Sequence, residues 1–163
     1  QVTQGQHGAF HPGRTAELSV DGELIGYAGE LRPDVARDAD LPRTVGAFEV
    51  NLDRLIELAP KLVEAEPITT FPAATQDLSL VVPVEVPAAA LGAAVELGAG
   101  ELLEQISLVD DYRGTGIPDG QKSVTFALRF RAPDRTLTAA EASEAKLAGA
   151  ARAAELFAAT IRE

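Results

Sequence analysis

The segment from residue 77 to residue 163 constrains the fold most, because strand-like and helix-like patterns alternate along it. Alternating apolar residues, and short apolar runs ended by proline or glycine, predict strands at residues 77–82, 102–113, 122–131 and 159–163. Helical spacing of apolar residues predicts helices at residues 86–99 and 138–158. Pro87 suits a first helical turn, and Thr138 with Glu141 forms a capping box. The order of elements is therefore β-α-β-β-α-β.

This order predicts an α+β fold of the split βαβ, or ferredoxin-like, type. Such a fold places both helices on one face of a four-stranded antiparallel sheet. The other face is left open for a partner, as in RNA-recognition modules. Fold alone does not decide the function, since ferredoxin-like sheets also pair edge to edge or bind small ligands.

The front part of the chain, residues 1–67, is predicted to be a separate α+β segment that ends in a linker. Its pattern predicts an irregular opening over residues 1–14, a hairpin turn at Asp21 and Gly22, and a helix cap at Asp53. The elements predicted around these points are strands at residues 15–22, 23–31 and 45–52 and helices at residues 33–41 and 54–58. Prolines across residues 60–72 predict the linker, and the second domain is placed at residues 68–163.

Alternation along the strand at residues 122–131 decides which side chains reach the open face. The face towards the helices is apolar and consists of Val124, Phe126, Leu128 and Phe130. The open face carries hydroxyl and basic groups: Ser123, Thr125, Ala127, Arg129 and Arg131. On the preceding strand Asp110 and Tyr112 share one face. Asp111 between them falls on the core side, which predicts a bulge or a fraying strand end.

These side chains could form an RNA site. Tyr112 offers a ring on which a base can stack, a contact worth about 1–3 kcal/mol per base. Asp110 offers an acceptor and Ser123 a donor for base edges, and the candidate phosphate contacts are Arg113, Lys122, Arg129 and Arg131. Plainer interpretations remain open on pattern alone. An arginine-rich strand face is usually solvated, a tyrosine near a turn usually packs, and aspartates beside a turn usually cap or face water.

The charge balance argues against free nucleic acid as a partner. The chain has 163 residues and a net charge of −11 at pH 7, so its average field repels RNA. An RNA role therefore needs a local basic patch, or charge supplied by neighbouring domains. The same balance favours a rival function, a non-RNA protein-interaction or small-ligand regulatory module on a ferredoxin-like fold.

The sequence predicts no catalytic site and no metal site. The chain has no cysteine, so thiolate ligands are excluded, and its carboxylates show no recognisable metal spacing. Both histidines, His7 and His11, lie in the irregular opening, and there is no P-loop, dinucleotide fingerprint or nucleophile elbow. No apolar run approaches the roughly 20 residues that span a bilayer. Because the chain begins with Gln1 and lacks methionine, we expect it to be a piece of a longer protein.

An ordered set of short motifs resembles the β subunit of bacterial phenylalanyl-tRNA synthetases. In the front part the motifs lie at residues 10–14 (FHPGR), 26–31 (GYAGEL) and 47–50 (AFEV), and resemble the catalytic-like but inactive module of that family. In the second part they resemble its ferredoxin-fold anticodon-binding domain, and lie at residues 71–74 (FPAA), 77–82 (DLSLVV), 110–114 (DDYRG), 122–123 (KS) and 134–138 (DRTLT).

The resemblance implies a division of the chain and a role for each part. Residues 1–67 would be the C-terminal part of the inactive class II synthetase module with a linker, and residues 68–163 the anticodon-binding domain. In the family, an aspartate, a tyrosine two residues later and a serine on the next strand read the anticodon. These positions match Asp110, Tyr112 and Ser123.

The resemblance also implies the setting of the whole enzyme. It is a cytoplasmic α2β2 ligase that joins phenylalanine to its tRNA with ATP and Mg²⁺, and its aminoacylation centre is in the α subunit. This chain would then bind phenylalanine-specific tRNA without catalysing, would hold no cofactor of its own, and would not contact a membrane.

Overall fold

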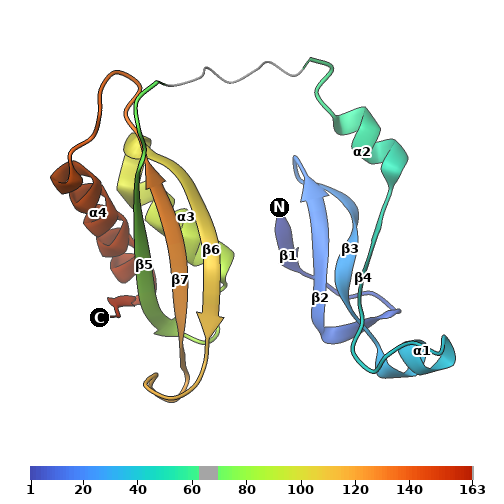
Figure 1. Ribbon diagram of the computed structural model, residues 1–163. Coiled ribbons are helices and arrows are strands. Elements are labelled where there is room, and N and C mark those ends of the chain that lie inside the picture. Colours follow the sequence, from blue (N-terminus) through green and yellow to red (C-terminus); the bar gives the residue numbers. More distant parts are fainter. Residues whose placement is uncertain (63–69, 163) are drawn as a thin grey trace. The chain divides into compact units, whose positions relative to one another are not determined.

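The computed structural model describes residues 1–62 and 70–162 of the chain. The chain divides into two compact units, Gln1–Glu66 (unit 1) and Pro67–Glu163 (unit 2). Figure 1 shows the elements of each unit along the chain. The predicted domain boundary at residue 68 lies outside the described residues and stays a prediction.

Unit 1 is built on an antiparallel sheet in the order β1-β2-β3-β4. The strands are β1 (Val2–Gln4), β2 (Phe10–Val20), β3 (Glu23–Leu31) and β4 (Gly46–Val50). Helix α1 (Pro33–Asp38) lies between β3 and β4 in the chain, and α2 (Leu52–Leu58) follows β4. The predicted hairpin at residues 21 and 22 is confirmed, since both residues have positive φ between β2 and β3.

Two local predictions for unit 1 are wrong. The opening is not irregular throughout, because β1 and the first part of β2 lie within residues 1–14. The regular pairing of β2 with β3 is interrupted between Phe10 and Thr15, so Pro12 and Gly13 fall where few ladder hydrogen bonds are needed. The cap of α2 is Asn51 rather than Asp53, and its side chain accepts a 3.1 Å hydrogen bond from the backbone N–H of Arg54.

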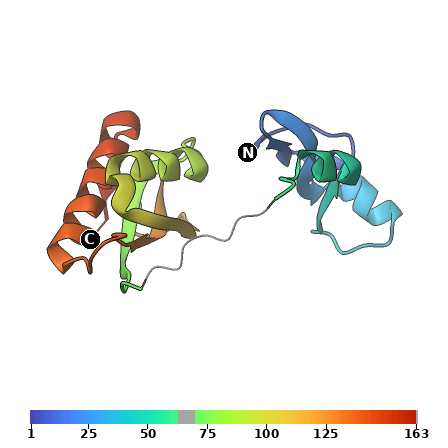
Figure 2. The ribbon, with the colours of Figure 1, turned by 90° about the horizontal axis from the view of Figure 1, so that it is seen from above.

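Unit 2 has the predicted β-α-β-β-α-β order. Its elements are β5 (Ala74–Pro83), α3 (Ala88–Ala99), β6 (Leu103–Tyr112), β7 (Gln121–Phe130), α4 (Ala139–Phe157) and β8 (Thr160–Ile161), with a 3₁₀ turn at Gly100–Leu102 before β6. The strands form one antiparallel sheet in the order β6-β7-β5-β8. Figures 1 and 2 show both helices on the same face of this sheet. The predicted ferredoxin-like α+β fold is therefore confirmed.

The core of unit 2 lies between that sheet face and the two helices. The predicted inward side chains of β7 are all buried, as are those of β5 facing the helices: Leu78, Leu80, Val82, Val124, Phe126, Leu128 and Phe130. Helices α3 and α4 pack closely through small residues. A Cβ atom at Gly149 would lie 2.8 Å from the carbonyl oxygen of Val95, so glycine is required at this crossing.

The start of α4 is fixed by the predicted capping box. The Thr138 hydroxyl accepts a 3.2 Å hydrogen bond from the backbone N–H of Glu141, and the Glu141 carboxylate accepts a 2.9 Å bond from the backbone N–H of Thr138. The hydrogen bonds from Thr138, together with the Arg135 guanidinium, lower the pKa of Glu141 to about 2. Along the described parts of the chain, the helices are too short or too polar to cross a membrane.

Candidate nucleic-acid interface

The face of the unit 2 sheet that the helices leave uncovered brings together the three predicted base-contacting residues. Asp110 of β6 lies opposite Thr125 of β7, and Tyr112 lies opposite Ser123. These four side chains share the open face because cross-strand partners point to the same side of a sheet. Strand alternation therefore places two of the predicted residues, Asp110 and Tyr112, on the same face as the third, Ser123.

An irregularity in β6 sets this arrangement. The pairing register shifts between Leu108 and Asp110, so Val109 is an extra residue on the β6 side. Beyond the shift Asp111 lies opposite Val124 and points to the helix-covered face. The predicted bulge near Asp111 is confirmed, and it explains how a charged residue occupies a core-side position of this strand.

Tyr112 has a defined place at the end of the sheet. Its side chain is 36% exposed, and its hydroxyl donates a 3.3 Å hydrogen bond to the carbonyl oxygen of Thr115. A Cβ atom at Gly114 would lie 2.8 Å from the Tyr112 hydroxyl, so the absence of a side chain there makes room for the ring. These contacts place the ring against the turn that follows β6.

A residue that the sequence reasoning did not select lies over this ring. The guanidinium carbon of Arg162 is 5.5 Å from the centroid of Tyr112, within the range of a cation–π contact. Arg162 follows β8, and its backbone N–H donates a 2.9 Å bond to the carbonyl oxygen of Ser79. The sequence did offer a signal for Arg162. If the predicted strand at residues 159–163 is paired with the predicted strand at residues 77–82, strand alternation can place Arg162 on the open face.

Ser123 is less accessible than a donor to a base edge, its predicted role, would need to be. The residue is only 1% exposed, and its hydroxyl oxygen has no hydrogen-bond partner among the residues that the structure describes. An orphaned buried hydroxyl is costly, so a partner that reached it would be favoured. Asp110, by contrast, is exposed.

Lys122 does not fit the predicted phosphate contact. It is 4% exposed, and its ammonium group lies 3.0 Å from the Asp111 carboxylate. The physical reason is alternation: Lys122 shares the helix-covered face with Val124, and its charge is already paired there.

The predicted arginine contacts each have an acidic neighbour. Arg129 and Arg131 share the carboxylate of Glu104, at 2.5 Å and 2.8 Å. Arg131 also donates to the carbonyl oxygen of Phe71, which ties the start of the domain to β7. Arg113 lies 3.0 Å from Asp111. Phosphate binding at this face would require the arginines to exchange carboxylate partners for phosphate oxygens.

Other concave regions of the described structure differ in character. A groove of about 350 Å³ between α3 and β6 is apolar, with Ile106, Leu108 and Phe126 in its lining. In unit 1 the His7 ring lies 4.7 Å from the Tyr27 ring, and its Nε2 atom is 3.4 Å from the Glu49 carboxylate. Within residues 1–62 and 70–162, no three His, Cys, Asp or Glu side chains gather as a metal-binding group.

Comparisons with known proteins identify similarities for both units. Residues 69–162 match the ferredoxin-fold anticodon binding domain family, and residues 1–52 match the phenylalanyl tRNA synthetase beta chain CLM domain family. The phenylalanine--tRNA ligase beta subunit of Leifsonia xyli is 65% identical over 100% of this chain. The subunits of the same name from Streptomyces avermitilis and Nocardia farcinica are 52% and 49% identical over 99% and 94% of it. The aligned region covers 20%, 20% and 18% of those three proteins, so this chain spans about a fifth of their length.

Proposed function

This chain belongs to the ferredoxin-fold anticodon-binding domain family and is related along its length to phenylalanine–tRNA ligase β subunits, and we propose that unit 2 binds the anticodon of a phenylalanine-specific tRNA. The observation that carries the proposal is the grouping of Asp110, Tyr112 and Ser123 on the open face of the sheet. Flat sheet faces with an aromatic ring are a recurrent way to hold unstacked RNA bases.

Each of the three residues has a distinct part in the proposed site. The Tyr112 ring stacks on an anticodon base, and the exposed Asp110 carboxylate accepts hydrogen bonds from a base edge. The Ser123 hydroxyl, which has no partner within the described residues, donates to a base once the side chains above it move aside. Arg113, Arg129 and Arg131 contact phosphates after leaving their carboxylate partners, and Lys122 has no direct contact with the RNA.

The proposal extends to the protein of which this chain is a part. That protein is the β subunit of a cytoplasmic ligase that joins phenylalanine to tRNA, pairs with an α subunit in an α2β2 assembly, and uses ATP and Mg²⁺. Residues 1–67 serve there as part of an inactive, catalytic-like module. The names of the relatives support this setting, and they favour it over the rival of a non-RNA regulatory module.

The test is binding of the 163-residue chain to a phenylalanine-tRNA anticodon stem-loop and to a stem-loop with an unrelated anticodon. We expect preference for the cognate stem-loop at low salt. Tyr112→Ala should weaken binding of the cognate stem-loop by the value of one stacked base, about 1–3 kcal/mol or roughly 5- to 150-fold. Tyr112→Phe is the matched control, because it keeps the ring and removes only the bond to Thr115.

Two results would contradict the proposal. One is binding of equal strength to both stem-loops in the wild type. The other is a Tyr112→Ala variant that keeps the full affinity for the cognate stem-loop while folding normally by circular dichroism.

A further inference from the structure

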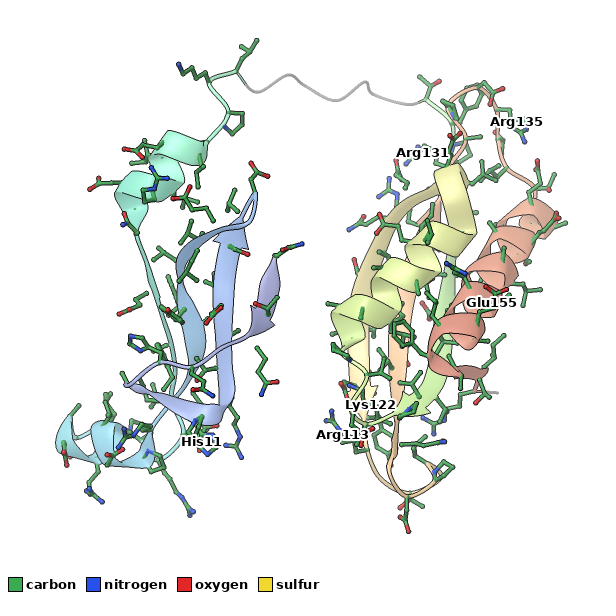
Figure 3. All side chains as sticks on the ribbon, turned by 180° about the vertical axis from the view of Figure 1, so that it is seen from behind. His11, Arg113, Lys122, Arg131, Arg135 and Glu155 are labelled. Atoms are coloured by element: carbon green, nitrogen blue, oxygen red, sulfur yellow. The ribbon has the colours of Figure 1, made fainter. Side chains whose placement is uncertain are left out.

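Directly behind the proposed site, on the helix-covered face, lies an ion pair between Asp111 and Lys122. Asp111 is flanked in β6 by Asp110 and Tyr112, and Lys122 immediately precedes Ser123 in β7. The Lys122 ammonium donates a 3.0 Å hydrogen bond to the Asp111 carboxylate. Each partner is thus covalently adjacent to residues of the proposed site but points to the opposite side of the sheet. Figure 3 shows Lys122 and Arg113 at the same end of the sheet.

Water has little access to the Lys122 ammonium and partial access to the Asp111 carboxylate. The Lys122 side chain is 5% exposed, and that of Asp111 is 27% exposed. Arg113 also reaches Asp111, but its own side chain is 54% exposed, so water can take its place. Leaving a buried ammonium without its partner strongly destabilises a fold, whereas the intact ion pair costs little stability. Any rearrangement that separates Asp111 from Lys122 is therefore penalised.

The strand that carries Asp111 is one whose register needs such a restraint. Among the described residues β6 is an edge strand that pairs with β7, and its register already shifts at Val109. A slip of one residue in an irregular strand moves every side chain beyond it to the other face. Here a slip would bring Asp111 to the open face and turn Asp110 and Tyr112 towards the helices.

We infer that Asp111 and Lys122 are positioning residues for the proposed anticodon site: their buried ion pair fixes the register of β6 against β7, and so keeps Asp110 and Tyr112 beside Ser123 on the open face. Specification of register is the best-attested use of a buried polar pair in proteins. The inference rests on the proposed function, and it assigns Lys122 a role without contact to RNA.

The test uses a double variant of the full chain, Asp111→Leu with Lys122→Met, which removes both charges and leaves neither unpaired. The readouts are cross-strand nuclear Overhauser effects for the pairs 110/125 and 112/123, the urea midpoint, and the affinity for the cognate stem-loop. Because apolar replacement of a buried pair is often neutral for stability, the urea midpoint should stay near that of the wild type. The native cross-strand signals should weaken beside a second set. The affinity for the cognate stem-loop should fall roughly 5- to 150-fold, the value of one stacked base.

The matched control removes an exposed ion pair that lies on a helix rather than on a strand of the sheet. Arg152 and Glu155 form an exposed 2.8 Å pair on α4, and Figure 3 labels Glu155 on that helix. Arg152→Met with Glu155→Leu should leave the cross-strand signals and the affinity for the cognate stem-loop unchanged. If the first double variant does not fold, Lys122→Met alone is used. In that variant Asp111 still has Arg113 as a partner at the surface, and the second set of cross-strand signals should appear.

A folded double variant with only native cross-strand signals and the wild-type affinity for the cognate stem-loop would overturn the inference. The two proposals also fail separately. If the wild-type chain shows no cognate preference, the anticodon proposal fails, while the cross-strand signals still decide whether the pair sets the register.

Discussion

A single carboxylate, that of Glu104, controls the charge of the open face near Arg129 and Arg131. Glu104 lies where the register of β6 shifts for a first time, between Leu103 and Gln105. This position lets its two oxygens contact both arginines, at 2.5 Å and 2.8 Å. The pairs are partly exposed, so their attraction is modest and salt-sensitive. The open face is therefore less basic than its arginine count implies.

This arrangement predicts that Glu104→Gln strengthens RNA binding. Removing the negative charge frees Arg129 for a phosphate, and each added phosphate contact steepens the dependence of the logarithm of the binding constant on the logarithm of salt concentration by about 0.7–0.9. The measurement is stem-loop affinity at several salt concentrations, with Glu101→Gln, an exposed residue just before β6, as the control. Unchanged affinity and slope would mean that these arginines do not meet phosphate.

At the level of single residues, alternation predicted which face of the sheet a side chain points to better than it predicted how exposed that side chain is. The pattern along residues 122–131 placed Val124, Phe126 and Phe130 in the core, because the face of a regular strand follows from parity alone. Alternation also places Lys122 on the helix-covered face with Val124, but the burial of Ser123 and the pairing of Lys122 with Asp111 could not be predicted in this way. Both depend on which β6 residues lie opposite, and that depends on the irregularity at Val109.

Among the elements, α4 has the most completely specified start. Thr138 and Glu141 exchange side-chain to backbone hydrogen bonds, and Arg135 lies 2.6 Å from the Glu141 carboxylate. The capping signal was readable from sequence because it is local, spanning four residues. The start of β2 at Phe10 could not be read from the sequence, because Pro12 and Gly13 normally end a strand. Pairing with β3 is what extends β2 back to Phe10.

We expect Thr138→Ala to lower the free energy of unfolding by about 1 kcal/mol, since it leaves helix N–H groups without their cap. Urea denaturation at pH 7 measures the change, and Thr136→Ala, in the preceding loop, is the control. An unchanged urea midpoint in Thr138→Ala would show that the cap does not stabilise α4.

The pKa of Glu141 gives the capping box a pH dependence. Because the folded state lowers that pKa to about 2, the ionised carboxylate stabilises the fold fully above the ordinary glutamate pKa of about 4.3. The stabilisation is lost as the pH falls through about 2. The difference in unfolding free energy between the wild type and Glu141→Gln should therefore be constant near neutrality and shrink between these two pH values. A difference that grows with acid would contradict the assignment.

Across the whole molecule the two units differ in how much apolar surface they bury. In unit 2, buried side chains from the sheet and both helices form one cluster. Among the described residues of unit 1, the buried apolar side chains are those of Phe10, Ile25 and Ala36, while Phe48 is 73% exposed. Burial of apolar surface is the main source of stability, so we expect unit 1 to be the less stable unit.

Native-state hydrogen exchange measures this difference. Backbone amides in β2 and β3 should exchange faster than those in β5 and β7, although both pairs of strands are fully hydrogen-bonded over most of their length. Equal protection of the two sheets would contradict the expectation and would indicate that unit 1 gains stability from contacts of another kind.

The irregular course of β6 also bears on how the protein behaves in concentrated solution. Exposed sheet edges are templates on which second chains add as further strands and begin to aggregate. In the unit 2 sheet one edge, β6, has its backbone register broken at two points, and the other, β8, is two residues long. The β6 edge therefore has no long straight row of free backbone groups, whereas residues 74–78 of β5 have no strand partner on the β8 side among the described residues. Strand addition between copies is therefore disfavoured at the β6 edge.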